Sequence, residues 1–478
     1  MIRSSLPAMR ILASFLLLSA ALHAEVTLPA MFADGAVLQR ERPVPVWGTA
    51  APGEAVTVSF RGQTASTQAD RLGRWSVALQ PAAAGGPHEL TVNNITLKNV
   101  LVGEVWIASG QSNMVWRVAQ SRDAEKEIAA STDAELRFFK VANVVSPVPL
   151  DDVKGAWKEA NPANTGDFCG AGYFFARHLR EKLKVPVGVI QTSWGGTPAE
   201  SWVSGTALAA DPALISVYAD WARTLEAYPV GLLEKRQNLI GPNHPHMPAG
   251  LYNAMIAPLI PYAMRGVIWY QGENNANRAR AGVYRRLFPA LIQDWRRRWG
   301  QGDFPFLFVQ LANYAKVPAT AQWPELREAQ AMTLSLANTG MAVIIDIGES
   351  QSIHPRNKQD VGLRLGLAAR AIAYGEKLVY SGPAYRRFMR EGSALRVWFD
   401  HVGGGLVAED GALKGFEVCQ ANGKCAAAEA RIDGATVVAA SAEIPEPANV
   451  RYAWGNDPPC NLYNAEGLPA GPFRSNPD

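Results

Sequence analysis

The sequence has little of what membrane proteins, zinc proteins and nucleic-acid-binding proteins need. Beyond residue 24, no apolar run approaches the ~20 residues that cross a bilayer. The four cysteines form no CxxC pair and no Cys/His ligand set, so a structural zinc is not expected. Lys and Arg (46) nearly balance Asp and Glu (43), and the formal net charge of +3 reflects no basic stripe. A nucleic-acid partner is therefore not expected.

What the sequence does contain at its start is an export signal. Two arginines precede the apolar run Ile11–Leu22, and a small residue follows at position 24. A charged start, a short apolar segment and a small-residue end are typical of a secretory signal peptide. We therefore predict a signal peptide over residues 1–24 and a mature, periplasmic or secreted chain that begins near Glu25.

The mature chain is predicted to contain three regions. Its 478-residue precursor is 48% hydrophobic and 19% charged, which indicates a packed globular protein of two or three domains. Short β-forming runs broken by Gly and Pro predict a β-sandwich-like accessory domain over residues 25–99. Residues 376–478 are β-like again and end in a tail with several aromatic residues. We expect this β-rich C-terminal region to pack on the main body.

Residues 100–375 alternate apolar strands with helical patterns, which is typical of a parallel α/β sheet. The expected strands are Val105–Ala108, Val185–Ile190, Gly266–Tyr270, Phe304–Val309 and Met341–Ile345. The expected helices are Gly172–Leu183, Phe288–Trp299, Glu325–Ala337 and Lys358–Ala373. In the second of these helices, Pro289 falls in the first turn, where its missing N–H costs nothing.

Four of these strands lead directly into polar loops. Parallel sheets bind ligands beyond the carboxyl ends of their strands, where the connecting loops converge. We therefore expect the four loops to meet at one edge and to form a site. They are Gly110–Ser112, Gln191–Thr197, Gln271–Asn275 and Asp346–His354.

Ser112 is the candidate nucleophile, because a serine hydroxyl with a base against it can cleave an ester. Taken alone, a serine at a strand-to-helix turn is better explained as an N-cap. His354 is the candidate base, since it follows a predicted strand end; the alternative is a solvated loop histidine before Pro355. His244 and His246 lack a nearby carboxylate at helical spacing, so a binding or loop role is expected for them rather than a metal site.

The other loops offer partners for these two residues. Gly195 and Gly196 allow close backbone approach, so one of their N–H groups is expected to join that of Ser112 in an oxyanion hole; a flexible turn is the alternative. Glu273 is the candidate acid that orients His354, although a carboxylate that only braces the loop fits equally well. Side-chain donors to the oxyanion are expected from Gln271, Asn274 and Asn275.

The cysteines give one further expectation. Cys419 and Cys425 flank Asn422-Gly423, a pair that favours a tight hairpin turn, so we expect a disulfide across it. Cys169 and Cys460 could pair or stay free.

As a set, the loop motifs resemble those of the sialate O-acetylesterase family, which belongs to the SGNH hydrolase superfamily. The resemblance covers nearly the whole mature chain. It rests on Gly110–Met114, Trp194–Thr197, Trp269–Glu273 and Ile353–Pro355, with Leu28–Phe32 and Cys460–Asn464 as further matches.

The resemblance implies a three-layer α/β/α catalytic domain with β-rich N- and C-terminal accessory regions. It also implies a cofactor-free and metal-free serine esterase that removes acetyl groups from sugars, with Ser112 as nucleophile and His354 as base. One departure stands out: relatives commonly place an aspartate two or three residues before the histidine, where this chain has Ser352 and Gln351. Either a Ser–His dyad operates, or the acid comes from elsewhere. The candidates are Glu273 first and then Glu349 or Asp346.

The substrate is open at this point. Acetylated xyloglucan or other hemicellulose oligosaccharides and O-acetylated sialic acids would look alike to the catalytic loops. Gln111, Trp194 and His246 are the expected sugar contacts, because such residues suit hydroxyls and ring faces. The alternatives are an SGNH-type lipid or thioester hydrolase and a non-catalytic sugar-binding protein. The joint presence of Ser112, His354 and several oxyanion donors argues against the last.

Overall fold

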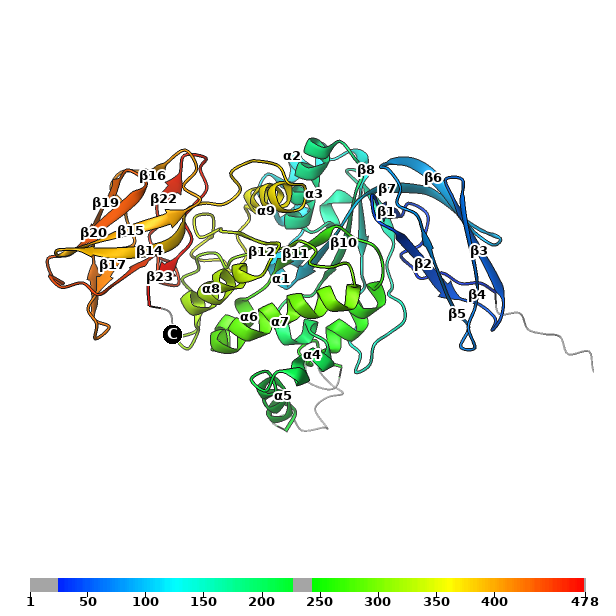
Figure 1. Ribbon diagram of the computed structural model, residues 1–478, viewed down its shortest axis with the longest axis horizontal. Helices are drawn as coiled ribbons and strands as arrows, with labels where there is room; N and C mark the ends of the chain where they lie inside the picture. The colour runs from blue at the N-terminus through cyan, green and yellow to red at the C-terminus, as the bar shows by residue number, and fades with distance from the viewer. Residues whose placement is uncertain (1–24, 227–242, 477–478) are drawn as a thin grey trace, which may run out of the picture.

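A computed structural model describes residues 25–226 and 243–476, so the predicted signal peptide lies outside the described residues. Three regions follow one another along the long axis of the molecule (Figure 1). A β region formed by the N-terminal part of the chain lies at one end, an α/β region lies in the middle, and a second β region lies at the other end. In the described part of the chain, none of the helices has both the length and the apolar character that a bilayer crossing requires.

The middle region is built on one twisted sheet. Its first six strands run parallel, and the last strand pairs antiparallel with its neighbour. The order across the sheet is β13 (Thr339–Ala342), β12 (Phe306–Val309), β11 (Gly266–Tyr270), β7 (Ile95–Gly110), β10 (Val187–Ser193), β8 (Asp133–Lys140) and β9 (Trp157–Ala160). All five strands that the apolar runs predict belong to this sheet.

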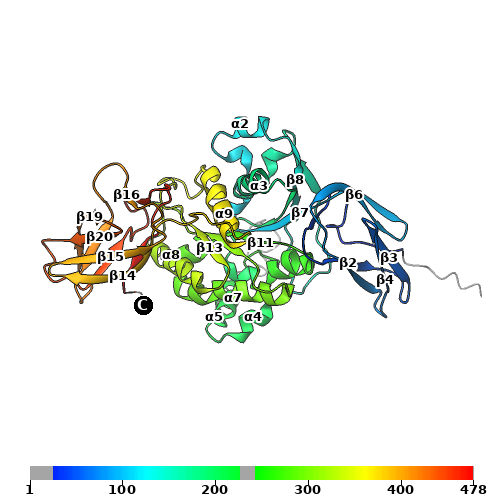
Figure 2. The ribbon, with the colours of Figure 1, turned by 45° about the horizontal axis from the view of Figure 1, so that its top comes forward.

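Helices cover both faces of the sheet (Figures 1 and 2). On one face lie α3 (Gly170–Leu183) and α9 (Lys358–Ile372), and on the other lie α7 (Ala281–Trp299) and α8 (Trp323–Met332). The alternation of β11 side chains shows why both faces are covered. Trp269 packs against Phe288 and Trp295 of α7, whereas Ile268 and Tyr270 belong to the core under α3 and α9. The expected three-layer α/β/α fold is confirmed.

The start of α7 corrects one expectation. The helix begins at Ala281, so Pro289 lies inside it and not in its first turn. An internal proline removes a backbone hydrogen bond and costs about 3 kcal/mol. Tyr284 and Leu287, both fully buried, continue the apolar stripe toward the N-terminus. Burying two such side chains contributes about 1.5–3 kcal/mol each, which offsets the cost of the proline.

The N-terminal region is joined to the middle region through β7. The first half of this strand pairs with β6 (Gly85–Val92) and β1 (Val37–Gln39), and its second half pairs with β10 and β11. One continuous strand therefore crosses residues 99 and 100 and fixes the N-terminal region to the catalytic sheet. The remaining strands of this region are β2 (Val44–Thr49), β3 (Ala55–Phe60), β4 (Gln63–Gln68) and β5 (Arg74–Leu79).

The C-terminal region consists mainly of two small sheets, in the orders β14-β15-β20-β19 and β18-β17-β21-β23. Cys419 of β17 and Cys425 of β18 are paired neighbours and form the expected disulfide, which is confirmed. Cys169 and Cys460 are free thiols. The strands are β14 (Ala384–Glu391), β15 (Ala394–Asp400), β17 (Phe416–Cys419), β18 (Cys425–Ala427), β19 (Glu429–Asp433), β20 (Thr436–Ala440), β21 (Asn449–Tyr452) and β23 (Phe473–Arg474).

Polar contacts hold this region against α8. Arg474 donates two hydrogen bonds to the carboxylate of Glu328, at 2.8 and 3.0 Å. Arg327, which is fully buried, donates to the carbonyl oxygens of Gly455 and Asn456. The end of the chain is thereby bonded to a helix that covers the catalytic sheet.

Candidate active site

Ser112 stands at a sharp turn between β7 and α1 (Ser112–Val115). The turn depends on Gly110, whose φ is +137°; a Cβ at this position would lie 2.1 Å from the carbonyl oxygen of Tyr270. Glycine alone fits there. Ser112 thus becomes the first residue of α1 with a partly exposed side chain, and its N–H donates to no acceptor among the described residues.

The loop after β10 lies directly against this turn. The N–H of Trp194 donates to the carbonyl of Gly110 (3.1 Å), and a Cβ on Gly195 would lie 3.5 Å from that of Ser112. Neither Gly195 nor Gly196 uses its N–H in a hydrogen bond to any residue placed in the structure. The exposed N–H groups of Ser112 and Gly195 therefore belong to adjoining backbone segments beside the serine.

Two side chains fix the Gly196 carbonyl. His246 Nε2 lies 2.8 Å from this oxygen, and Asn274 Nδ2 donates to it at 2.7 Å. Burial, assisted by His244 and Arg278, lowers the pKa of His246 to about 4. The ring is therefore neutral at pH 7, and Nε2 carries the proton that it donates to Gly196.

The predicted amide donors of the third loop differ in what they bond. Gln271 uses both amide hydrogens internally, to the carbonyl of Thr197 (3.3 Å) and to Oδ1 of Asn275 (2.6 Å). Asn275 is fully buried and donates to Glu200. These two residues brace the loops. Asn274 is only partly buried, and its amide lies beside the Gly195–Gly196 turn.

Gln111 and Trp194 are predicted as sugar contacts, but in the structure the side chains of both also contact other parts of the protein. Gln111 is 3% exposed, and its side-chain oxygen accepts from the N–H of Asn274 at 3.2 Å. The ring of Trp194 is half-buried and packs on the core beneath the loops. Gln111 ties the serine turn to the loop after β11, and Trp194 keeps part of its ring at the surface.

A buried hydrogen-bond network lies beneath the serine turn and centres on Asn113. The amide nitrogen of Asn113 donates to Glu273 Oε1 (2.6 Å) and to the carbonyl of Ile353 (2.9 Å), and its oxygen accepts from Lys358 Nζ (2.6 Å). Burial raises the pKa of Glu273 and lowers that of Lys358 to about 7, the latter against the attraction of Glu273 and Glu349. Sequence reasoning missed Asn113 and Lys358, although Asn113 directly follows Ser112, the candidate nucleophile.

His354 lies at the end of this network, one residue after Ile353. Burial, and next the positive charge of Lys358, lower the pKa of His354, so the ring is neutral at pH 7 and able to accept a proton. Its Nε2 is buried and has no hydrogen-bond partner among the residues that the structure places. No hydrogen bond joins the ring to Ser112 in the described structure, and such catalytic bonds often tighten only when substrate binds.

The candidate acids are all bonded elsewhere. Glu273 is bonded to Asn113, and Glu349 accepts from the N–H of Arg356 (2.7 Å). Asp346 forms a two-pronged pair with Arg364, at 2.6 Å for each bond. Across residues 25–226 and 243–476, no carboxylate accepts a hydrogen bond from the ring of His354.

The ring of His354 instead contacts an aromatic side chain that sequence reasoning missed. The rings of Trp116 and His354 are stacked, with centroids 4.9 Å apart and planes 18° from parallel. Trp116 is two residues beyond Met114, the end of the motif that carries Ser112, but nothing in the local sequence indicates which ring it covers.

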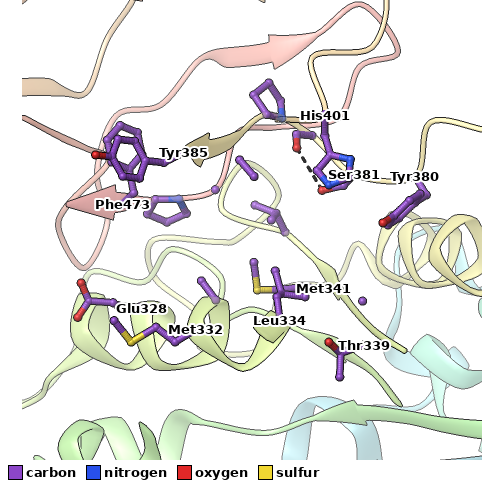
Figure 3. Close-up of a pocket in the computed structure, with 18 of the residues that line it drawn as sticks. Glu328, Met332, Leu334, Thr339, Met341, Tyr380, Ser381, Tyr385, His401 and Phe473 are labelled. Carbon is purple, nitrogen blue, oxygen red and sulfur yellow. Dashed lines mark hydrogen bonds between the residues drawn. The ribbon is translucent and has the colours of Figure 1, made fainter. Parts of the chain in front are cut away.

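A separate cavity of about 420 Å³ lies between α8, β13 and the C-terminal β region (Figure 3). Its walls are mostly apolar, and none of the predicted site residues lines it. The residues that line the cavity include Met332, Leu334, Met341, Tyr385, His401 and Phe473. In the part of the chain that the structure describes, no three His, Cys, Asp or Glu side chains are grouped so that they could hold a metal ion.

Comparisons with known proteins identify the family of the chain. The family model described as carbohydrate esterase, sialic acid-specific acetylesterase matches residues 102–228 and 238–373. The sialate O-acetylesterases of mouse (Mus musculus) and human (Homo sapiens) are each 32% identical over 91% of this chain, which covers 92% and 90% of those proteins. A crystal structure of a carbohydrate acetylesterase from Xanthomonas citri has 42% identity and a TM-score of 0.85, over 95% of this chain and 100% of that one. The resemblance expected from the motifs is confirmed, and the protein is a carboxylic ester hydrolase with carbohydrate acetylesterase activity. The chain belongs to the sialic acid-specific acetylesterase family of carbohydrate esterases.

Proposed function

We propose that this enzyme removes acetyl groups from sugars through an acetyl-serine intermediate on Ser112, with His354 as the base and without a metal. The observation that supports this most strongly is the meeting of three loops at the serine turn. Ser112, the Gly195 backbone and the buried link from Asn113 to Ile353 come from three strands and meet at the carboxyl edge of the sheet.

In the first half of the reaction, Ser112 Oγ attacks the carbonyl carbon of the acetyl ester while His354 takes the hydroxyl proton. The carbonyl oxygen becomes an oxyanion, which the N–H groups of Ser112 and Gly195 stabilise, with Asn274 Nδ2 as a side-chain donor. The bond from the acetyl carbon to the sugar oxygen then breaks. The sugar oxygen takes the proton from His354 and leaves as a free hydroxyl.

In the second half, water attacks the acetyl carbon of the intermediate and gives a proton to His354. The same donors stabilise the second oxyanion. The bond to Ser112 Oγ breaks, Ser112 regains its proton from His354, and acetate leaves. In this scheme Gln271 and Asn275 act as braces, and Glu273 acts on the site through its bond to Asn113.

Two substrate classes fit the proposal: O-acetylated sialic acids and acetylated hemicellulose fragments such as xyloglucan oligosaccharides. His246 and the exposed part of the Trp194 ring are the side chains next to the serine turn that suit a sugar. We also propose that the enzyme works outside the cytosol, because its Cys419–Cys425 disulfide persists best in an oxidising compartment.

The test is acetate release from both substrates by the wild-type enzyme and by Ser112→Ala. We expect release from at least one substrate, with kcat/KM reduced by more than about 1,000-fold in Ser112→Ala. Ser335→Ala, on an exposed position away from the site, is the matched control and should keep wild-type activity. Substantial activity in Ser112→Ala would overturn the serine mechanism. Wild-type enzyme that releases acetate from neither sugar would overturn the proposed substrate classes.

A further inference from the structure

The indole of Trp116 is fixed to the nucleophile's own turn. The backbone N–H of Trp116 donates to the carbonyl of Ser112 (2.8 Å), and the carbonyl of Trp116 accepts from the N–H of Gly170 at the start of α3 (2.7 Å). The indole Nε1–H donates to the carbonyl of Gln120 at 3.0 Å. Backbone and ring of Trp116 are both held, so the ring is a fixed surface relative to Ser112.

That fixed surface lies against the imidazole of His354. The two rings are close to parallel, with centroids 4.9 Å apart. The other bonds of His354 involve its backbone: its N–H donates to Ser352 Oγ, and its carbonyl accepts from the same hydroxyl, both at 3.2 Å. Among the hydrogen bonds and ring contacts that His354 makes with the described residues, the stacked indole is the one that can set the plane of the imidazole.

In a Ser-His-Asp triad the acid does two things: it orients the imidazole and it stabilises the imidazolium that forms during acyl transfer. A stacked indole can do both. Its face restricts rotation of the ring, and the negative face of an indole attracts a cation within about 6 Å of its centroid. Such a contribution matters here because burial, and next the positive charge that Lys358 carries when protonated, oppose the imidazolium and lower the pKa of His354.

We propose that Trp116 is a positioning residue that orients His354 and stabilises its protonated form, the work that an acid does in a triad. The proposal rests on the proposed roles of Ser112 and His354. It explains how the His354 ring is oriented although no carboxylate among the described residues accepts a hydrogen bond from it.

The test compares Trp116→Phe with Trp116→Leu. Both substitutions keep an apolar side chain over His354, but only phenylalanine keeps an aromatic face. Each variant is measured on an O-acetylated sugar and on ethyl acetate, an ester with neither a sugar nor a ring to stack on the indole. Trp398→Leu is the matched control, because Trp398 is also partly exposed and lies in the C-terminal sheet.

We expect Trp116→Leu to lower kcat on the sugar by about 10-fold with KM within about 2-fold, and to lower kcat/KM on ethyl acetate by a similar factor. Trp116→Phe should recover most of this loss. Thermal unfolding is followed for every variant, so that a misfolded Trp116→Leu is recognised and the decision then rests on Trp116→Phe, which should fold and keep most of the wild-type kcat.

Four results would overturn the proposal. A loss confined to the sugar, or seen only as a higher KM, would make Trp116 a substrate contact. Wild-type kcat in a folded Trp116→Leu, or a folded Trp116→Phe as slow as the leucine variant, would remove its action on His354. Ser112→Ala is measured in the same series: activity there would overturn the proposed function itself, whereas an inactive Ser112→Ala beside a fully active Trp116→Leu would overturn the role of Trp116 alone.

Discussion

The loop after β11 and the loop after β13 both reach the serine turn, but they are held in different ways. Glu273, on the first loop, is 2% exposed and bonded to Asn113, whose side chain also binds Lys358. His354, on the second loop, is partly exposed. Its ring stacks on the indole of Trp116, whereas the carboxylate of Glu273 is held by hydrogen bonding. The turn that carries Ser112, the proposed nucleophile, is thus held by a buried hydrogen-bond network. The loop that carries His354, the proposed base, is held by ring stacking and by bonds in a partly exposed loop.

This difference suits the chemistry of the two sides. The nucleophile and the oxyanion donors must keep their geometry through both halves of the reaction. The base must exchange protons with serine, sugar and water, so it needs an accessible ring and a pKa that leaves it neutral. The charge attraction between the buried Glu273 and Lys358, which Asn113 bridges, is weak evidence of added stability, because desolvation cancels much of it. We therefore interpret the Glu273–Asn113–Lys358 network as a group of contacts that fixes the position of the serine turn and adds little net stability.

Of the changes to these two loops, removal of the Asn113 side chain should lower stability and activity most, because it breaks the buried hydrogen-bond network beneath the serine turn. In Asn113→Ala, the buried Glu273 and Lys358 both lose their side-chain partner, and the serine turn loses its bond to Ile353. Leaving a buried polar group without its hydrogen-bond partner costs about 1–3 kcal/mol. With two such groups, we expect the free energy of unfolding in urea to fall by about 3 kcal/mol and kcat/KM to fall by about 100-fold.

Asn143→Ala is the control for this variant, since Asn143 is exposed and makes no side-chain hydrogen bond to the described residues. It should match the wild type in both measurements. An Asn113→Ala enzyme with wild-type stability and activity would show that the network is not what holds the serine turn, and the contrast between the two sides would disappear.

Replacement of Lys358 should have an intermediate effect with a distinct pH signature. Burial, and next the charge of Lys358, lower the pKa of His354, so Lys358→Met should raise it. Because the neutral imidazole is the active form in the proposed mechanism, the acidic limb of the kcat/KM profile should move to higher pH. The control is Lys154→Met, on an exposed lysine, and its profile should overlay that of the wild type.

The same variant has a predicted effect on stability against pH. Burial lowers the pKa of Lys358 to about 7, whereas an unfolded lysine titrates near ~10.4. Between these values the unfolded chain binds more protons than the folded one, so the contribution of this group to stability rises with pH across that window. The urea concentration at the unfolding midpoint should therefore rise in the wild type relative to Lys358→Met between pH 7 and pH 9. Midpoints that stay parallel would mean that Lys358 keeps an ordinary pKa.

The two sides of the site also differ in how far sequence could predict them. Gly110 and Ser112 follow an apolar strand directly, so the turn and its serine are local features that a reader of the sequence can find. The network partners are not local: Glu273 lies 160 residues from Asn113, and Lys358 lies 245 residues away. Nothing near Lys358 distinguishes it from an ordinary lysine at the start of a helix.

The same limit applies to the fold. Five of the seven strands of the central sheet are largely buried on both faces and read as apolar runs, which is why they were predicted, whereas β8 and β9 at one edge were missed. The early start of α7 was missed because local rules place a proline in the first turn, whereas tertiary burial of Tyr284 and Leu287 decides the boundary. The stacking of Trp116 on His354 likewise depends on how two distant loops meet.

Loss of the Ser352 hydroxyl should have the smallest effect and tests the lightly held side. Its oxygen accepts from the N–H of His354 at 3.2 Å in a partly exposed loop, where water can replace it. We expect Ser352→Ala to lower the free energy of unfolding by less than about 1 kcal/mol and kcat by about 2–5-fold at unchanged KM. Ser216→Ala, which removes a similar bond to the carbonyl of Ala213 on an exposed helix, is the matched control for the loss of one local bond. A loss of activity in Ser352→Ala as large as that in Asn113→Ala would mean that the base loop is held as tightly as the nucleophile turn, because one weak exposed bond would then position His354 as strictly as the buried network positions Ser112.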